Sequence, residues 1–252
     1  TTLSAEELDT LMAKYPDLEV TYTLGLAGKE YMADTTSVDL SALSPTEILA
    51  AAETLGRMPE LANVELMTAA GTSPLSLSDV QTLVDAAPQA SFHYTFTLFD
   101  KTISTNDTQV EFKNLSLTEA DIPALRSALG VMTDCTAFIL DNCGLSSEQM
   151  AQIRADYPRT ELVWRIKFGK YSAMTNAETI RAVYNVFDDT SSELQYCWRV
   201  KYMDIGHNET LTDLSFVGSM PELEILIASG CAVKQLPEGI GNCKKLEFLE
   251  LA

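Results

Sequence analysis

The chain has 252 residues, of which 46% are hydrophobic, so it is long and apolar enough to bury the core of one or two domains. Its 36 acidic residues outnumber 17 basic ones, and the net charge of −19 would repel both nucleic-acid phosphates and anionic membrane surfaces. No apolar run reaches the roughly 18 residues needed to span a bilayer, so membrane insertion is not expected.

Three related segments follow one another in the first two thirds of the chain. Each combines a leucine–serine pair, a helical apolar pattern and a proline, and Pro16, Pro88 and Pro158 are 72 and 70 residues apart. An alternating apolar run follows each proline, which predicts a strand with one buried face. The three runs are Leu18, Val20, Tyr22 and Leu24; Phe92, Tyr94 and Phe96; and Leu162, Trp164 and Ile166.

Hydroxyl residues at capping-box spacing predict where helices begin, because the hydroxyl accepts a hydrogen bond from the amide three residues further on. The pairs are Ser4–Glu7, Ser44–Glu47, Ser76–Asp79, Ser116–Glu119 and Ser146–Gln149. In the third segment a helix signal at Thr175–Glu178 comes early, and the acidic stretch Phe187–Glu193 is predicted to be a loop that joins the long repeats to shorter ones.

A shorter repeat occupies the C-terminal part of the chain. The frame LxxLxLxx(N/C) begins at Val200, Leu223 and Leu246, with 23 residues between successive starts. This period lies within the range of about 20–29 residues that is typical of leucine-rich repeats. The same frame recurs at Cys135, Phe138, Leu140 and Cys143, and more loosely at Leu61, Val64, Leu66 and Ala69.

These patterns predict an α/β leucine-rich-repeat solenoid, with a curved, mainly parallel sheet on its concave side and helices and turns on its convex side. Residues 1–195 would form long irregular repeats and residues 196–252 regular repeats of one continuous solenoid. The last consensus place holds Asn208, Cys143 or Cys231. There the Asn side-chain amide can hydrogen-bond to backbone groups that the turn leaves unpaired, and a Cys can replace it as a small buried side chain. Five cysteines without a CxxC pair indicate neither a zinc site nor a complete disulfide framework.

The C-terminal part resembles a standard leucine-rich-repeat array, including the LPxxI segment that starts at Leu236. The earlier part resembles the irregular repeat regions of large leucine-rich-repeat proteins from Gram-positive gut bacteria. The runs from Asp141 to Ser146 and from Trp164 to Tyr171 carry that likeness. The resemblance implies secretion or display on the cell surface and recognition of a macromolecule, and it brings no catalytic residues.

A search for catalytic chemistry favours structural roles for the residues that it finds. His93 lies on the polar face of its predicted strand and His207 beside the turn residue Asn208. The chain has no GxSxG, HExxH or P-loop motif, and the acidic pair Asp188–Asp189 with Glu193 lacks EF-hand spacing. We therefore expect no enzyme activity, no cofactor and no metal site.

The predicted binding residues lie between the consensus leucines and point to the concave surface. Alignment of the regular repeats stacks Tyr202, Ile225 and Phe248 in one row and Asp204, Ile227 and Glu250 in the next. An exposed apolar row of this kind usually marks an interaction site. The expected function is recognition of a protein or glycan ligand, and the alternative is a structural spacer within a larger surface protein.

Two further expectations concern the ends of the chain. The sequence stops inside the third regular repeat, which exposes a strand edge at 247–251, so either the native protein continues or this edge associates with another copy. A start at Thr1 without an initiator methionine, together with the resemblance, predicts an extracellular or cell-surface location.

Overall fold

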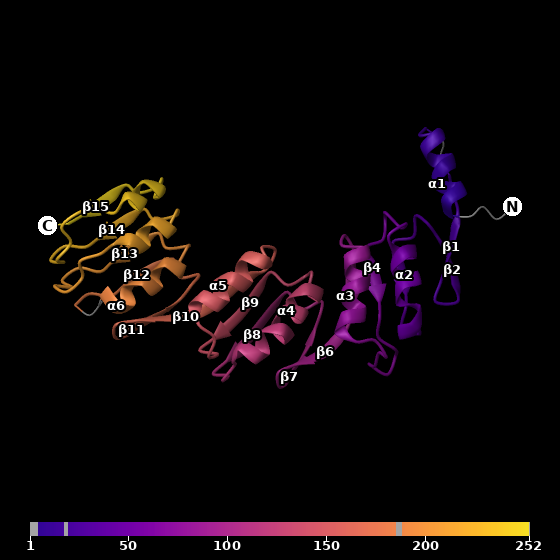
Figure 1. The fold of residues 1–252 in the computed structure, drawn as a ribbon, viewed down its shortest axis with the longest axis horizontal. Helices are drawn as coiled ribbons and strands as arrows, with labels where there is room; N and C mark the ends of the chain where they lie inside the picture. The colour runs from indigo at the N-terminus through magenta and orange to yellow at the C-terminus, as the bar shows by residue number, and fades with distance from the viewer. Residues whose placement is uncertain (1–4, 18–19, 185–187, 252) are drawn as a thin grey trace. The chain divides into compact units, whose positions relative to one another are not determined.

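A computed structural model describes residues 5–17, 20–184 and 188–251. The chain divides into two compact units, the first made of residues 1–107 and 127–134 and the second of residues 108–126 and 135–252. Each unit mixes helices with short strands, as the α/β prediction requires (Figure 1).

The elements of the described residues are as follows. The α-helices are α1 (Ala5–Lys14), α2 (Ile48–Leu55), α3 (Leu77–Ala86), α4 (Ile122–Val131), α5 (Ser147–Asp156) and α6 (Asp188–Ser191). The 3-10 helices are η1 (Pro45–Glu47), η2 (Glu119–Asp121), η3 (Ser192–Tyr196), η4 (Ser215–Ser219) and η5 (Glu238–Asn242). The strands are β1 (Thr23–Leu26), β2 (Lys29–Met32), β3 (Ser37–Asp39), β4 (Asn63–Glu65), β5 (Ser91–His93), β6 (Thr95–Leu98), β7 (Lys101–Ser104), β8 (Gln109–Lys113), β9 (Ala137–Asp141), β10 (Glu161–Phe168), β11 (Tyr171–Met174), β12 (Thr179–Arg181), β13 (Tyr202–Asp204), β14 (Ile225–Ile227) and β15 (Phe248–Glu250).

The first unit contains a small parallel sheet with the strand order β3-β4-β5. Val38, Val64 and Phe92 share one register position and are each at most 2% exposed, so the inner face of this sheet is the core. α2 and α3 pack against each other beside the sheet. Two antiparallel hairpins, β1–β2 and β6–β7, complete the unit.

The second unit contains two parallel arrays. β8, β9 and β10 pair in parallel, with β11 added antiparallel to the far end of β10, and α5 packs against β10. The other array has the order β12-β13-β14-β15 (Figure 1). Tyr202 pairs with Ile225 and Ile225 with Phe248, which confirms the register predicted by the 23-residue period.

Each alternating run leads into a hairpin where the sequence pattern predicted a single strand. β1 turns into β2 at Ala27–Gly28, β6 into β7 at Phe99–Asp100, and β10 into β11 at Gly169–Lys170. The first turn residue has a positive φ in every case, between 51° and 56°. In the first run, Leu18 lies outside the described residues, and the strand begins only at Thr23. Antiparallel pairing therefore interrupts the mainly parallel arrangement.

Three predicted capping boxes are confirmed at Ser44, Ser76 and Ser146. Ser4 lies outside the described residues. The prediction at Ser116 is wrong, because the capping box is formed by Thr118 and Asp121. The helix begins later than predicted because the Leu117 amide donates a hydrogen bond to the Cys143 carbonyl at 2.9 Å. At Leu117 the chain is therefore still paired with the neighbouring segment.

Two other local predictions are wrong for related reasons. The Thr175 hydroxyl is buried and accepts a hydrogen bond from the Trp164 amide at 3.2 Å, and the chain continues into β12 rather than a helix. The stretch predicted as a loop is helical over α6 and η3, with Leu194 fully buried; its first residue, Phe187, lies outside the described part. The buried Leu194 side chain holds this acidic segment against the core.

The core of the C-terminal array thins toward β15. Met203 and Leu226 are fully buried, whereas Leu249 is 36% exposed. β12, from the stretch assigned to the long repeats, pairs directly with β13 of the regular ones. The division into irregular repeats up to residue 195 and regular repeats after it stays a prediction. In the part of the chain that the structure describes, no helix is long and apolar enough to cross a membrane.

Candidate ligand-binding surface

The predicted binding residues occupy one face of β13, β14 and β15. We call Tyr202, Ile225 and Phe248 the apolar row and Asp204, Ile227 and Glu250 the second row; each row is in parallel register. The middle residues of β13 and β14, Met203 and Leu226, face the core, so the residues on either side of them point outward, whereas all three residues of β15 are exposed. Phe248 is 48% exposed, and the members of the rows on β13 and β14 are partly exposed. The structure thus brings all six predicted residues onto one surface.

β12 extends this surface by one strand, which the sequence pattern did not indicate. Arg181 stands in register with Asp204, and its guanidinium carbon lies 5.0 Å from the centre of the Tyr202 ring. This is the geometry of a cation–π contact. The early helix signal at Thr175–Glu178 concealed the strand, and the spacing of Ile180 and Ala182 before Met203 and Ile205 was the signal that could have found it.

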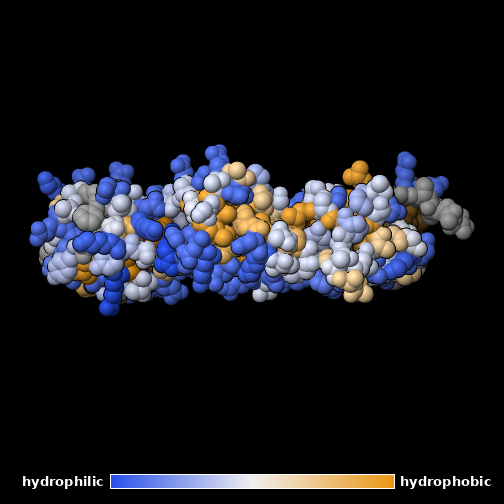
Figure 2. All heavy atoms as spheres, turned by 90° about the horizontal axis from the view of Figure 1, so that it is seen from below, coloured by the Kyte–Doolittle hydropathy of each residue, from blue (hydrophilic) through white to orange (hydrophobic). Residues whose placement is uncertain are grey.

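In the other parallel sheets, the residues at the register places of the apolar row are mostly polar or small: Ser37, Asn63 and Ser91 in the first unit, and Gln109, Ala137 and Glu161 in the second. Charged pairs lie at neighbouring places on these strands. On β9 and β10, Arg165 donates to both carboxylate oxygens of Asp141, at 2.5 and 3.0 Å, and this ion pair lowers the pKa of Asp141. In the first unit, His93 Nδ1 lies 2.8 Å from Glu65 Oε2. Hydrophilic side chains likewise cover much of the face seen in Figure 2. The apolar row therefore differs in chemistry from its counterparts.

Each of the two histidines contacts another side chain of the fold. His93 is exposed at the end of β5 and pairs with Glu65 on the adjacent strand. His207 has a positive φ of 55° in the turn after β13, and its ring stacks on Tyr184 with centroids 4.8 Å apart. His93 thus contacts Glu65 and His207 contacts Tyr184, and the structural roles expected for both from the sequence stay a prediction.

The turn residues act on the backbone as predicted. The Asn208 amide nitrogen donates to the carbonyls of Ala182, Ile205 and Gly206 at 2.9, 2.6 and 3.2 Å. The Cys231 thiol donates to the Ile205 carbonyl at 3.2 Å, and the Cys143 thiol to the Phe112 carbonyl at 3.4 Å. Burial raises the pKa of both thiols, which keeps them protonated and unreactive at neutral pH. At the last consensus place, the side chain therefore forms hydrogen bonds with backbone carbonyls of the turn.

The cysteines and acidic residues form no metal centre in the described ranges. The five cysteines, all of which the structure describes, form no disulfide, and burial raises the pKa of Cys197 to about 12. No group of three or more His, Cys, Asp and Glu side chains is arranged to hold an ion among the residues the structure describes. The suggested calcium ligands Asp189 and Glu193 belong to α6 and η3, and the Asp188 side chain lies outside the described ones.

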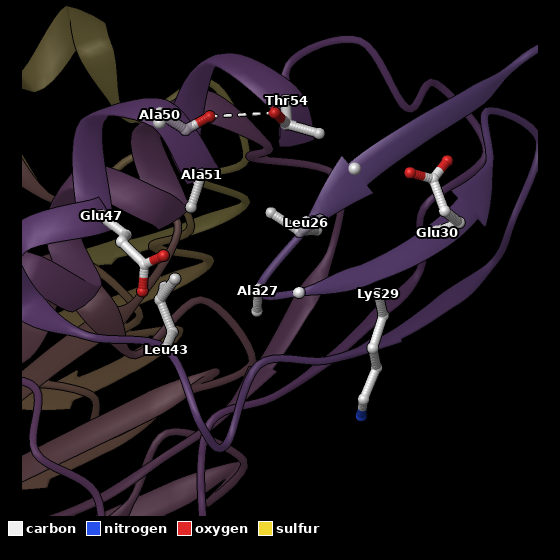
Figure 3. Close-up of a pocket in the computed structure, with 11 residues that line it drawn as sticks. Leu26, Ala27, Lys29, Glu30, Leu43, Glu47, Ala50, Ala51 and Thr54 are labelled. Carbon is white, nitrogen blue, oxygen red and sulfur yellow. Dashed lines mark hydrogen bonds between the residues drawn. The ribbon is translucent and has the colours of Figure 1, made fainter.

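A cavity of about 370 Å³ lies between the β1–β2 hairpin and α2 (Figure 3). Leu26, Ala27 and Ala51 line its apolar part. Two of its polar groups have local partners: the Glu47 carboxylate accepts from the Ser44 amide at 3.2 Å, and Lys29 pairs with Asp39 at 2.7 Å. This cavity therefore presents small apolar side chains beside the carboxylate of Glu30.

No family model and no curated protein matches the chain. Among solved structures it is similar to a leucine-rich-repeat protein of Leptospira interrogans, at 12% identity and a TM-score of 0.30, over 79% of this chain and 57% of that one. It is also similar to an internalin of Listeria monocytogenes (12%, 0.22, over 79% and 44%) and to an internalin C2 of the same species (13%, 0.24, over 79% and 65%). The chain spans less than two thirds of each of these proteins.

Proposed function

We propose that this chain is a continuous leucine-rich-repeat solenoid that serves as a non-catalytic recognition scaffold. The ligand is a protein or glycan, and it binds the concave face along the apolar row. The observation that carries the proposal is the exposed row of Tyr202, Ile225 and Phe248 in register on three adjacent strands, where the other parallel sheets place mostly polar or small residues. An exposed apolar patch with a polar rim is typical of an interaction site.

The chemistry of the surface limits which ligand fits. The apolar row supplies two aromatic rings, the residue types that contribute most at interfaces. Asp204 and Glu250 lie in the adjacent row, and Arg181 stands at its other end. A ligand with an apolar centre and mainly basic or hydrogen-bond-donating groups at its rim complements this arrangement. The resemblance noted in the sequence supports a location outside the cell or on its surface.

The experiment uses the double variant Tyr202→Ala with Phe248→Ala. Ligands captured from host and microbial surface extracts, and from a glycan array, are tested against the wild-type chain and the variant. We expect the affinity for the true ligand to fall about 10-fold or more, because truncation of an aromatic anchor typically costs 2 kcal/mol or more. Leu49→Ala is the matched control, since Leu49 is 79% exposed on α2 and lies outside the surface.

The results separate the alternatives. Equal binding by wild type and double variant would overturn the concave-face proposal. Absence of any ligand for the wild-type chain would favour a structural spacer within a larger surface protein. Edge-to-edge association through β15 stays a separate prediction, which sedimentation of the chain at increasing concentration tests.

A further inference from the structure

A second cavity lies within the second unit, away from the apolar row. It measures about 580 Å³, which is within the usual size of small-molecule sites. Arg154, Arg159 and Arg199 all line it, together with Trp198. Glu161 also lines it and pairs with Arg199 at 3.0 Å. Three cations against one carboxylate is an unusual balance in a chain whose net charge is −19.

Arg154 is held in place by aromatic rings rather than by a carboxylate. Its guanidinium carbon lies 4.8 Å from the Trp164 ring centre and 4.2 Å from that of Trp198. One of its nitrogens donates to the Tyr196 carbonyl at 3.4 Å. A guanidinium carries five N–H donors, so this single long bond leaves most of them available. The orientation of the group is thus fixed while its hydrogen-bonding capacity is largely unused.

The charge of Arg154 is also uncompensated. The side chain is partly buried, and burial lowers its pKa. Within the described ranges, Arg154, Arg159 and Arg181 are the arginines that form no ion pair, although the chain has 36 acidic residues. Two of these three line the same cavity. Arginines that lack a carboxylate in so acidic a protein are suited to a carboxylate supplied by a ligand.

We propose that the cavity lined by Arg154, Arg159 and Trp198 binds the carboxylate of an acidic sugar, such as a uronic acid unit of a glycan. The fixed guanidinium of Arg154 offers parallel N–H donors to the carboxylate, and Arg159 adds a second cation. Trp198 is partly exposed and provides a flat apolar surface with a polar edge. A sugar ring has apolar faces and polar edges that match it, which favours an acidic sugar over an acidic peptide.

The chain provides its own probe for this site. Its two tryptophans are Trp164 and Trp198, and both contact Arg154. Titration with sodium glucuronate should change the intrinsic tryptophan fluorescence of the full chain in a saturable way. Glucose, and sodium chloride at matched ionic strength, should produce no saturable change. Inorganic phosphate and a Glu-rich peptide are titrated in parallel.

Variants connect the signal to the cavity. Arg159→Gln should weaken glucuronate binding about 10-fold or more, since hydrogen bonds to charged groups contribute about 1.5–3 kcal/mol. Arg159 is exposed, so this variant should fold even if Arg154→Gln does not. Lys234→Gln is the matched control, because Lys234 is also an exposed cation and lies outside both the cavity and the apolar row. It should bind glucuronate like the wild type.

The outcomes are distinct. No saturable response to glucuronate, or equal affinity in Arg159→Gln, would overturn the proposal. Saturation by phosphate or by the peptide without saturation by glucuronate would overturn the assignment to an acidic sugar. The double variant at Tyr202 and Phe248 should keep its glucuronate response, because it changes no residue of this cavity. Failure of this site is therefore separable from failure of the concave-face proposal.

Discussion

Asn208 shows how one side chain sets the turn after a repeat strand. It is 3% exposed, and its amide nitrogen serves three carbonyl oxygens on two neighbouring turns. Buried carbonyls without a donor are costly, so an amide that donates to carbonyls of both turns helps to hold adjacent repeats in register. Cys231, one repeat later, makes a single weaker thiol bond to the Ile205 carbonyl. Asn and Cys are alternatives at this place of the repeat, but they do not stabilise the turn equally.

Asn208→Ala should lower the free energy of unfolding by about 1–3 kcal/mol, because it removes the donor of the Ala182 carbonyl and leaves the Ile205 carbonyl with only the weaker Cys231 thiol. Urea unfolding followed by circular dichroism measures the change. Asn242→Ala is the control, since Asn242 is exposed and donates to one carbonyl, of Gly218. The role assigned to Asn208 would be contradicted if both variants lost the same small amount of stability.

At the scale of elements, helix starts and hairpins decide how each long segment folds. α3 and α5 begin at the capping boxes of Ser76 and Ser146. η2 begins instead at Thr118, because Leu117 is still bonded to the adjacent Cys143 turn. Gly144 belongs to that turn, where φ is +93° and a Cβ would lie 2.7 Å from the Leu117 carbonyl oxygen. Contact between neighbouring segments therefore shifts a helix start that local sequence places two residues earlier.

A pair of serine variants distinguishes these two types of position. Ser146→Ala should lower the free energy of unfolding by about 0.5–2 kcal/mol, the usual cost of losing an N-cap hydroxyl. Ser116→Ala should stay within about 0.5 kcal/mol of wild type, because Ser116 is exposed and does not cap η2. Both values come from urea unfolding. A loss at Ser116 as large as that at Ser146 would restore the capping box expected from the sequence.

At the scale of the whole molecule, the excess of acid is the dominant electrostatic feature. The chain carries 36 acidic and 17 basic residues, and its calculated isoelectric point is about 4.3. Surface ion pairs such as Lys29–Asp39 contribute little individually, whereas the remaining negative charges repel one another throughout the surface. Self-repulsion should therefore outweigh the exposed pairs in its effect on stability.

Raising sodium chloride from about 10 to about 150 mM shortens the screening distance from about 30 to about 8 Å. At pH 7 the urea midpoint of unfolding should rise, since screening relieves more repulsion than it removes attraction. Glycine at the same concentrations is the control, because a zwitterion does not screen charge in this way. A midpoint that falls with salt would mean that the ion pairs dominate.

Period and local hydrogen bonding were enough to predict much of this protein from its sequence. The 23-residue spacing fixes the register of Tyr202, Ile225 and Phe248, because parallel strands of equal repeats align equivalent residues. The boxes at Ser44, Ser76 and Ser146 lie within four residues of chain, so their geometry is local. The turn position of Asn208 was also predictable, because it follows from the repeat frame.

Tertiary structure alone decided the features that depend on distant contacts. β12 forms where the Trp164 amide is bonded to Thr175, a contact that no sequence period predicts, although Ile180 stands 23 residues before Met203, the spacing of the regular repeats. The arginine cavity gathers Arg154 from α5 and Trp198 from the turn before β13, 44 positions apart in the printed sequence. Periodicity specifies which residues are equivalent, but only folding brings together residues that are not.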